Sequence, residues 1–216
     1  MLTSAHAATL IKPYSQIKDL KRYCPEQLDT IKAAHKSAWQ DFKAFNLAVL
    51  DKLPHDFAPP HIEKWCNGWE IRRHFFAYYK YERYLANAPI ISVIVNPKRL
   101  IVSLDWHSYR QDSSSSTLPM YQNWLDAIDA SQFTDCYYWH SSTLMSVPDE
   151  AAFLPISQLA DDTLNLDGHY RLGKFIRADE LDNFTDSHGK DGDALVCWVV
   201  DTINQLAVAY ETCHQD

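Results

Sequence analysis

Glycine is scarce in this chain of 216 residues, which has 5 glycines and no glycine-rich loop. Neither G-x-G-x-x-G nor G-x-x-x-x-G-K-[ST] occurs, and this absence excludes dinucleotide and nucleotide binding by those loops. The G-x-S-x-G motif of serine hydrolases and the H-E-x-x-H motif of zinc proteases are also missing. No familiar catalytic motif therefore identifies an activity.

Paired cysteines and long apolar runs are missing as well. The five cysteines lie far apart and include no C-x-x-C pair, which predicts neither a disulfide framework nor a zinc ribbon. No run approaches the ~18 apolar residues that span a bilayer, and the first residues lack the pattern of a signal peptide. We therefore expect a soluble cytoplasmic protein with no membrane partner.

The charge is unevenly distributed along a chain of ordinary globular composition. Hydrophobic residues make up 46% of the chain and charged residues 22%, and we expect one domain over residues 1–216. The net charge of −8 disfavours nucleic acid. Residues 1–110 carry 16 Lys/Arg and 10 Asp/Glu, whereas residues 111–216 carry 4 and 18. Either the two halves neutralise each other by packing, or the first half offers a basic pocket to a small anionic ligand.

Two long helices are predicted before the sheet, so that residues 1–88 are mainly helical. Residues 25–54 place apolar side chains at helical spacing and end at Pro54. Residues 61–87 form the second predicted helix, which is aromatic nearly all round and contains Gly68. A helix of this kind is typical of a central position covered on several sides.

A β-hairpin is the clearest local signal. Residues 89–95 and 100–109 are strand-like and flank four residues with the chemistry of a turn, Asn96 to Arg99. Pairing Val95 with Leu100 gives one wholly apolar face, and period 2 favours this register.

The remaining elements complete an α+β fold. We expect a helix over 119–130, a third strand over 135–145, a helical turn or two within a loop over 149–164, and a closing helix over 193–213. Residues 169–178 form a fourth strand, or an edge strand because of Gly173. The predicted fold is an antiparallel or mixed sheet of about four strands within residues 89–178, with a central hairpin, covered by N-terminal and C-terminal helices.

The candidate catalytic residues are Asp105, His107 and Tyr109, which share one face of a predicted strand, and His140 on the next strand. A carboxylate beside an imidazole is an arrangement used in acid–base catalysis, so one alternative is a hydrolase-type enzyme; the other is an ordinary polar sheet face. If Asp105 is its partner, the pKa of His107 should lie above about 6.5. The spacing does not demand a metal, and we predict neither a metal site nor a cofactor.

The candidate ligand-binding residues are Trp69, Arg73, Lys80 and Arg83, on the second predicted helix. Buried basic groups need partners. The acidic second half could supply them, or Arg73 and Lys80 could hold a phosphate or carboxylate. A third alternative is a non-enzymatic interaction module, in which the oppositely charged halves drive formation of a homo-oligomer.

The run WCNGWEIRRHFFAYYKYERYLANAPIISVIVNPKRLIVSLDWHS and the chain length resemble a small family of uncharacterised bacterial proteins. Some members of that family carry the label glucose-6-phosphate 1-dehydrogenase. The resemblance covers roughly residues 60–110 and implies a soluble bacterial protein. It transfers no functional motif and no site residue to this chain.

Overall fold

The computed structural model of the chain describes residues 1–141, 152–164, 167–186 and 194–215. The described strands form one antiparallel sheet in the order β1-β2-β3-β4-β7-β5-β6. They are β1 (His61–Ile62), β2 (Phe75–Tyr79), β3 (Pro89–Val95), β4 (Arg99–Trp106), β5 (Tyr137–His140), β6 (Leu154–Pro155) and β7 (Tyr170–Arg177). The α-helices are α1 (Ser4–Thr9), α2 (Ile17–Tyr23), α3 (Leu28–Leu50), α4 (Leu118–Gln122), α5 (Trp124–Ala127), α6 (Asn183–Asp186) and α7 (Ala194–Thr212).

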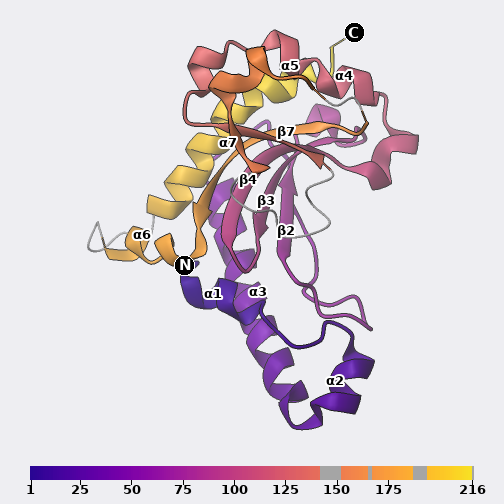
Figure 1. Cartoon of the computed structure of the whole chain (residues 1–216), viewed down its shortest axis with the longest axis vertical. Helices are drawn as coiled ribbons and strands as arrows, with labels where there is room; N and C mark the ends of the chain where they lie inside the picture. Colours follow the sequence, from indigo (N-terminus) through magenta and orange to yellow (C-terminus); the bar gives the residue numbers. More distant parts are fainter. Residues whose placement is uncertain (142–151, 165–166, 187–193, 216) are drawn as a thin grey trace.

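The two long helices, α3 and α7, pack on one face of the sheet (Figure 1). Helix α7 buries an apolar stripe against β3, β4 and β7, including Leu195, Val199 and Ile203. Alternate residues of the strands, such as Val93 and Val102, complete this main core, because side chains two apart in a strand point to the same face. The predicted α+β class, with helices at both ends of the chain and an antiparallel sheet, is confirmed.

The hairpin has the predicted register. Val95 pairs with Leu100, and the pairing continues residue by residue along β3 and β4. The Oδ1 atom of Asn96 accepts hydrogen bonds from the backbone N–H groups of Lys98 and Arg99 at 2.8 and 2.9 Å. An asparagine side chain that binds the backbone two and three residues on stabilises a tight turn, which explains why the turn lies where the sequence places it.

The predicted helix over residues 61–87 is wrong. This segment contains β1 and β2, followed by a 3₁₀ turn, η2 (Glu82–Tyr84). Before β2 the chain reverses through Gly68, whose φ of +101° interrupts a helix. In β2 the burial alternates, and Phe75, Ala77 and Tyr79 enter the core. The sheet region therefore begins at His61 and not at residue 89.

The described part of the sheet has seven strands, not about four, because β1, β2 and β6 add to the predicted set. Strand β7 is not an edge strand; it lies between β4 and β5. Gly173 marks a close approach of two backbones instead, since a Cβ atom there would clash with the Val102 carbonyl and lie 2.8 Å from the Cα atom of Ser103.

Other predicted elements are shorter than expected. The helix over 119–130 is broken into α4 and α5, and the strand over 135–145 is β5, with residues 142–145 outside the described part of the chain. Residues 154–161 contain β6 and a 3₁₀ helix, and the closing helix is α7. None of the helices in the described residues is both long enough and apolar enough to cross a membrane.

Candidate functional site

The face of the sheet opposite α3 and α7 carries buried polar side chains. On β4, Ser103 and Asp105 point to this face and are 1% and 5% exposed, and Arg171 on β7 is also 5% exposed. Buried polar groups destabilise a fold unless they are paired. The hydroxyl groups of Ser103 and Ser92 form a hydrogen bond of 3.0 Å. The charged groups of Asp105 and Arg171 therefore remain to be explained.

The carboxylate of Asp105 is held by residues of β7 and of the loop before it. Its Oδ1 atom accepts hydrogen bonds from Arg171 Nε at 2.6 Å, from His169 Nε2 at 3.3 Å and from the backbone N–H of Trp106 at 2.7 Å. Burial opposes ionisation, but Arg171 and His169 outweigh it and lower the pKa of Asp105. The carboxylate is therefore ionised, and all three donors bind its Oδ1 atom.

His107 is not the partner of Asp105, contrary to the expectation from strand spacing. Strand β4 ends at Trp106, and the His107 N–H donates to the Ala88 carbonyl at 2.9 Å as the chain turns away. Burial, Lys80 and Arg110 lower the pKa of His107, and they outweigh the opposite effect of Asp105. The expected rise of this pKa is corrected to a decrease.

Tyr109 and His140 also lie apart from Asp105. Tyr109 follows β4 in a 3₁₀ helix, η3 (Ser108–Ser113), and is 92% exposed. His140 pairs with Tyr170, and the two rings are 5.1 Å apart. Tyr170 belongs to the main core, so His140 points to the face opposite Asp105. The four candidate catalytic residues thus do not form one constellation.

The structure does bring three basic side chains together around Tyr78. We call Lys80, His107 and Arg110 the basic cluster. Lys80 Nζ is 5.6 Å from the centre of the Tyr78 ring, and the ring of His107 is 5.1 Å from it. Arg110 lies close enough to Tyr78 to favour its ionised form, although burial dominates and raises the pKa of that hydroxyl.

The members of the basic cluster repel one another. Burial and then Arg110 lower the pKa of Lys80 to about 8. Burial, Lys80 and Arg110 likewise lower the pKa of His107. The Lys80 ammonium donates to the backbone carbonyls of Leu85 and Asn87, which satisfies hydrogen bonds without supplying negative charge.

Asp105 acts electrostatically on His107, and Glu63 acts on Tyr78, but both carboxylates are already paired elsewhere. Asp105 is bound to Arg171 at 2.6 Å, and Glu63 is bound to Arg72 at 3.2 Å. In the described part of the chain, no carboxylate forms an ion pair with Lys80 or Arg110. The basic cluster is therefore a local excess of positive charge with an exposed rim.

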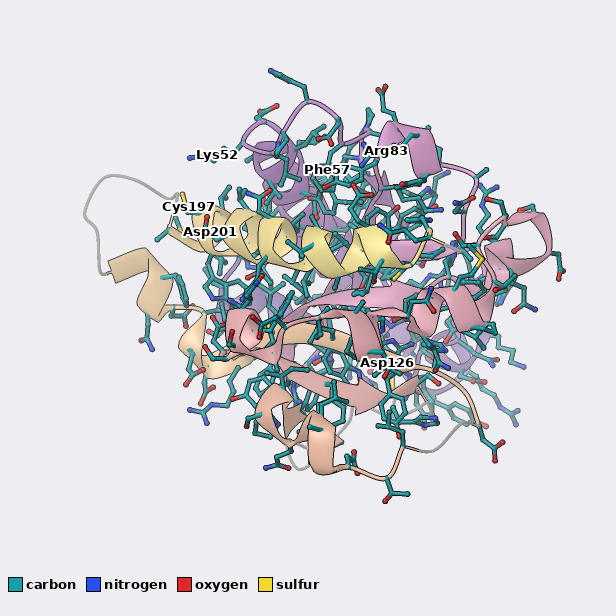
Figure 2. The ribbon with its side chains drawn as sticks, turned by 90° about the horizontal axis from the view of Figure 1, so that it is seen from above. Lys52, Phe57, Arg83, Asp126, Cys197 and Asp201 are labelled. Carbon is teal, nitrogen blue, oxygen red and sulfur yellow. The ribbon has the colours of Figure 1, made fainter. Side chains whose placement is uncertain are left out.

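The other predicted ligand-binding residues lie outside this cluster. Arg83 is exposed and pairs with Glu211, and with Asp56 at 3.6 Å; Figure 2 shows it over the later part of α7, with Cys197 near the beginning of that helix. The Arg83–Glu211 pair joins the basic and acidic halves of the chain. Arg73 and Trp69 are exposed near the turn at Gly68.

Sequence reasoning missed His169, Arg171 and Arg110 as site residues. The Asp105–Arg171 pair follows from the neighbouring positions of β4 and β7, whose pairing ends at Leu104 and Leu172. That pairing joins segments more than 60 residues apart, so no local spacing could indicate it. Arg110 had one local signal, its place three residues after His107. Among the described residues, no three His, Cys, Asp or Glu side chains gather in a way that could hold a metal ion.

Comparison with known proteins gives two results. A protein-family model matches residues 2–213. A relative described as an uncharacterized protein, from Haemophilus influenzae, is 38% identical over 206 residues, which cover 94% of this chain and 93% of the relative. These results confirm the resemblance to an uncharacterised bacterial family, and they do not show the glucose-6-phosphate 1-dehydrogenase label.

Proposed function

This chain belongs to the protein family whose model spans residues 2–213, and we propose that it binds a small anionic ligand at the basic cluster. The carrying observation is that Lys80, His107 and Arg110 gather around one ring, Tyr78, with no carboxylate of the described residues paired to either Lys80 or Arg110. A bound anion would replace mutual repulsion with charge-assisted hydrogen bonds.

The burial of Lys80 strengthens this proposal. Lys80 is 3% exposed, and its ammonium loses hydration that two backbone carbonyls replace only in part. An anion favours the charged forms of Lys80 and His107, so binding should take up protons near neutral pH. Arg110, which is exposed, would make the first contact with the ligand.

The sequence predicts the ligand-binding residues on a basic helix, but the segment that contains Lys80 is not helical. Lys80 directly follows the end of β2, and the polar surface beside it is the sheet face with Asp105. Arg83 already has two carboxylate partners, so we assign the ligand contacts to Lys80, His107 and Arg110. Because Asp105 is held by Arg171, a hydrolase using Asp105 and His107 is not favoured.

We also propose a cytoplasmic location. All five cysteines are free thiols, and Cys197 is exposed, which suits a reducing compartment. Fractionation of cells that produce the protein would test this, and recovery of the protein outside the cytoplasm would contradict it.

Thermal unfolding with inorganic phosphate, pyrophosphate or citrate tests the proposed site. A ligand that binds the native state stabilises it by about 2.7 kcal/mol at a concentration one hundred times its Kd, which raises Tm by several degrees. We expect at least one of these anions to raise Tm at constant ionic strength. Lys80→Met and Arg110→Gln should each abolish the shift.

Two matched variants separate binding from general charge effects. Lys12 resembles Lys80: its Nζ donates to the carbonyls of Leu10 and Arg72, and burial followed by Arg73 lowers its pKa to about 8. Arg22 resembles Arg110 as an arginine beside a tyrosine ring, 5.1 Å from the centre of Tyr23. Lys12→Met and Arg22→Gln should keep the ligand shift. Equal loss in both pairs of variants would reject the site.

A further inference from the structure

The basic cluster continues outward as a row of aromatic rings. His61 stacks on Tyr78 with ring centres 4.9 Å apart and an interplanar angle of 22°. The ring centres of Tyr78 and His107 are 5.1 Å apart, and those of His107 and Tyr109 are 5.9 Å apart. Three elements that are distant in sequence, β1, β2 and the segment after β4, thus place four rings side by side.

The outermost ring, Tyr109, is unusually exposed. It is 92% exposed, compared with 70% for Trp69 and 54% for Tyr23. It directly precedes Arg110, so an exposed apolar ring and an exposed guanidinium lie at the same rim of the basic cluster. Aromatic side chains that are exposed beside basic groups provide stacking surfaces for planar ligands, and the stacking does not depend on the identity of the ring.

We infer that the anionic ligand carries a planar ring, as in a nucleoside monophosphate. This inference rests on the proposed function. The phosphate would contact Lys80, His107 and Arg110, and the ring would stack on Tyr109. The chain lacks the glycine loops that hold phosphates through backbone N–H groups, so here side chains would hold the phosphate.

A free nucleotide fits the charge of the chain better than a nucleic acid does. The net charge is −8, and residues 111–216 carry 18 acidic and 4 basic residues. Long polyanions gain affinity from many basic contacts along their backbone, whereas a single phosphate needs one cluster. The proposed ligand is therefore a small aromatic phosphate, and a single-stranded oligonucleotide is the alternative that the experiment must reject.

Binding of AMP and of ribose 5-phosphate, measured by calorimetry on the full chain, tests the inference. The two ligands share the phosphate and the sugar but differ in the ring. We expect AMP to bind about ten-fold more tightly. Tyr109→Ala should make the affinities for AMP and ribose 5-phosphate nearly equal. Tyr109→Phe, which keeps the ring, should preserve the tighter binding of AMP. Trp69→Ala is the control, because it removes another exposed ring and should change neither affinity.

Each other outcome has a definite meaning. Equal affinities of the wild-type protein for AMP and ribose 5-phosphate would overturn the inference and leave the proposed anion site intact. Failure of both ligands, together with failure of inorganic phosphate, pyrophosphate and citrate, would overturn the site itself. Tighter binding of a single-stranded oligonucleotide than of AMP would overturn the assignment to a free nucleotide. Because Tyr109 is exposed, its variants should fold normally, and circular dichroism checks this.

Discussion

The Nε2 atom of His169 lies 3.3 Å from the Oδ1 atom of Asp105, so this carboxylate contacts a histidine 64 residues away instead of its near neighbour His107. Arg171 completes the arrangement with its Nε atom 2.6 Å from the same oxygen. Both partners come from β7 or the residue before it. The pairing of β4 with β7 therefore decides which imidazole meets the carboxylate.

Removal of Arg171 should destabilise the protein strongly. Arg171→Met leaves the buried Asp105 carboxylate without its main counter-charge, and such a loss costs about 3–5 kcal/mol. The double variant Asp105→Asn with Arg171→Met should be less destabilised than the sum of the single variants. Urea unfolding of the four proteins measures this. Arg72→Gln is the control, because its pair with Glu63 is partly exposed and should contribute at most about 1 kcal/mol.

The Asp105 pair should also depend on pH in a defined direction. Because the folded pKa of Asp105 is lowered, the carboxylate contributes stability above its unfolded pKa of about 3.9. This contribution is lost as pH falls through the lower folded pKa. The stability difference between the wild type and the double variant should be smaller at pH 3 than at pH 5. A difference that is unchanged at pH 3 would contradict the pair.

NMR titration of His107 should give a midpoint below about 6.5. Burial, Lys80 and Arg110 lower this pKa, so Lys80→Met should raise the midpoint, and so should a bound anion. Because the folded pKa is lowered, the unfolded chain takes up a proton first, and stability falls as pH drops from about 6.5 towards the folded pKa. A midpoint above 6.5 in the free protein would contradict this prediction and support an ion pair between Asp105 and His107.

His214 should stay neutral throughout the physiological range. Its Nδ1 atom accepts hydrogen bonds from Asn87 Nδ2 at 3.0 Å and Ser116 Oγ at 2.8 Å, and burial, Lys80 and Arg83 lower its pKa to about 4. Ser116→Ala should cost about 1 kcal/mol, whereas Ser113→Ala, at an exposed site, should cost little. Urea unfolding at pH 7 compares the two, and equal effects would count against the buried contact.

Gly173→Ala should be severely destabilising. A methyl group there would clash with the Val102 carbonyl and approach the Cα atom of Ser103 to 2.8 Å, so β4 and β7 must separate; we expect a loss of about 3 kcal/mol or more. Gly68→Ala is the contrasting variant, because its φ is +101° but no atom lies within 4 Å of the added Cβ. Strain alone should cost about 1–3 kcal/mol there. If Gly173→Ala has near wild-type stability, the close approach is wrong.

The elements that could be predicted from sequence are those specified by local contacts. The register of β3 with β4 follows from apolar alternation and the Asn96 turn, and α7 follows from its apolar stripe. The helix expected over 61–87 failed because Phe75, Tyr78 and Lys80 lie in a continuous aromatic and basic run, in which period 2 and period 3.6 fit equally well. The basic cluster depends on β2 lying beside β3, so only Lys80 and His107 could be named beforehand.

The position of β7 between β4 and β5 has a consequence for synthesis of the chain on the ribosome. Strands β2, β3 and β4 can pair in the order in which they emerge, because each lies in the sheet beside the strand that precedes it in the sequence. Strand β5 emerges before β7, which lies between β5 and β4 in the sheet. One edge of β5 can pair with β6, but the edge that faces β7 must wait for residues 170–177. During this interval the β4 edge is open to other chains. Ribosomes that stall between β5 and β7 should therefore leave nascent chains especially prone to aggregation.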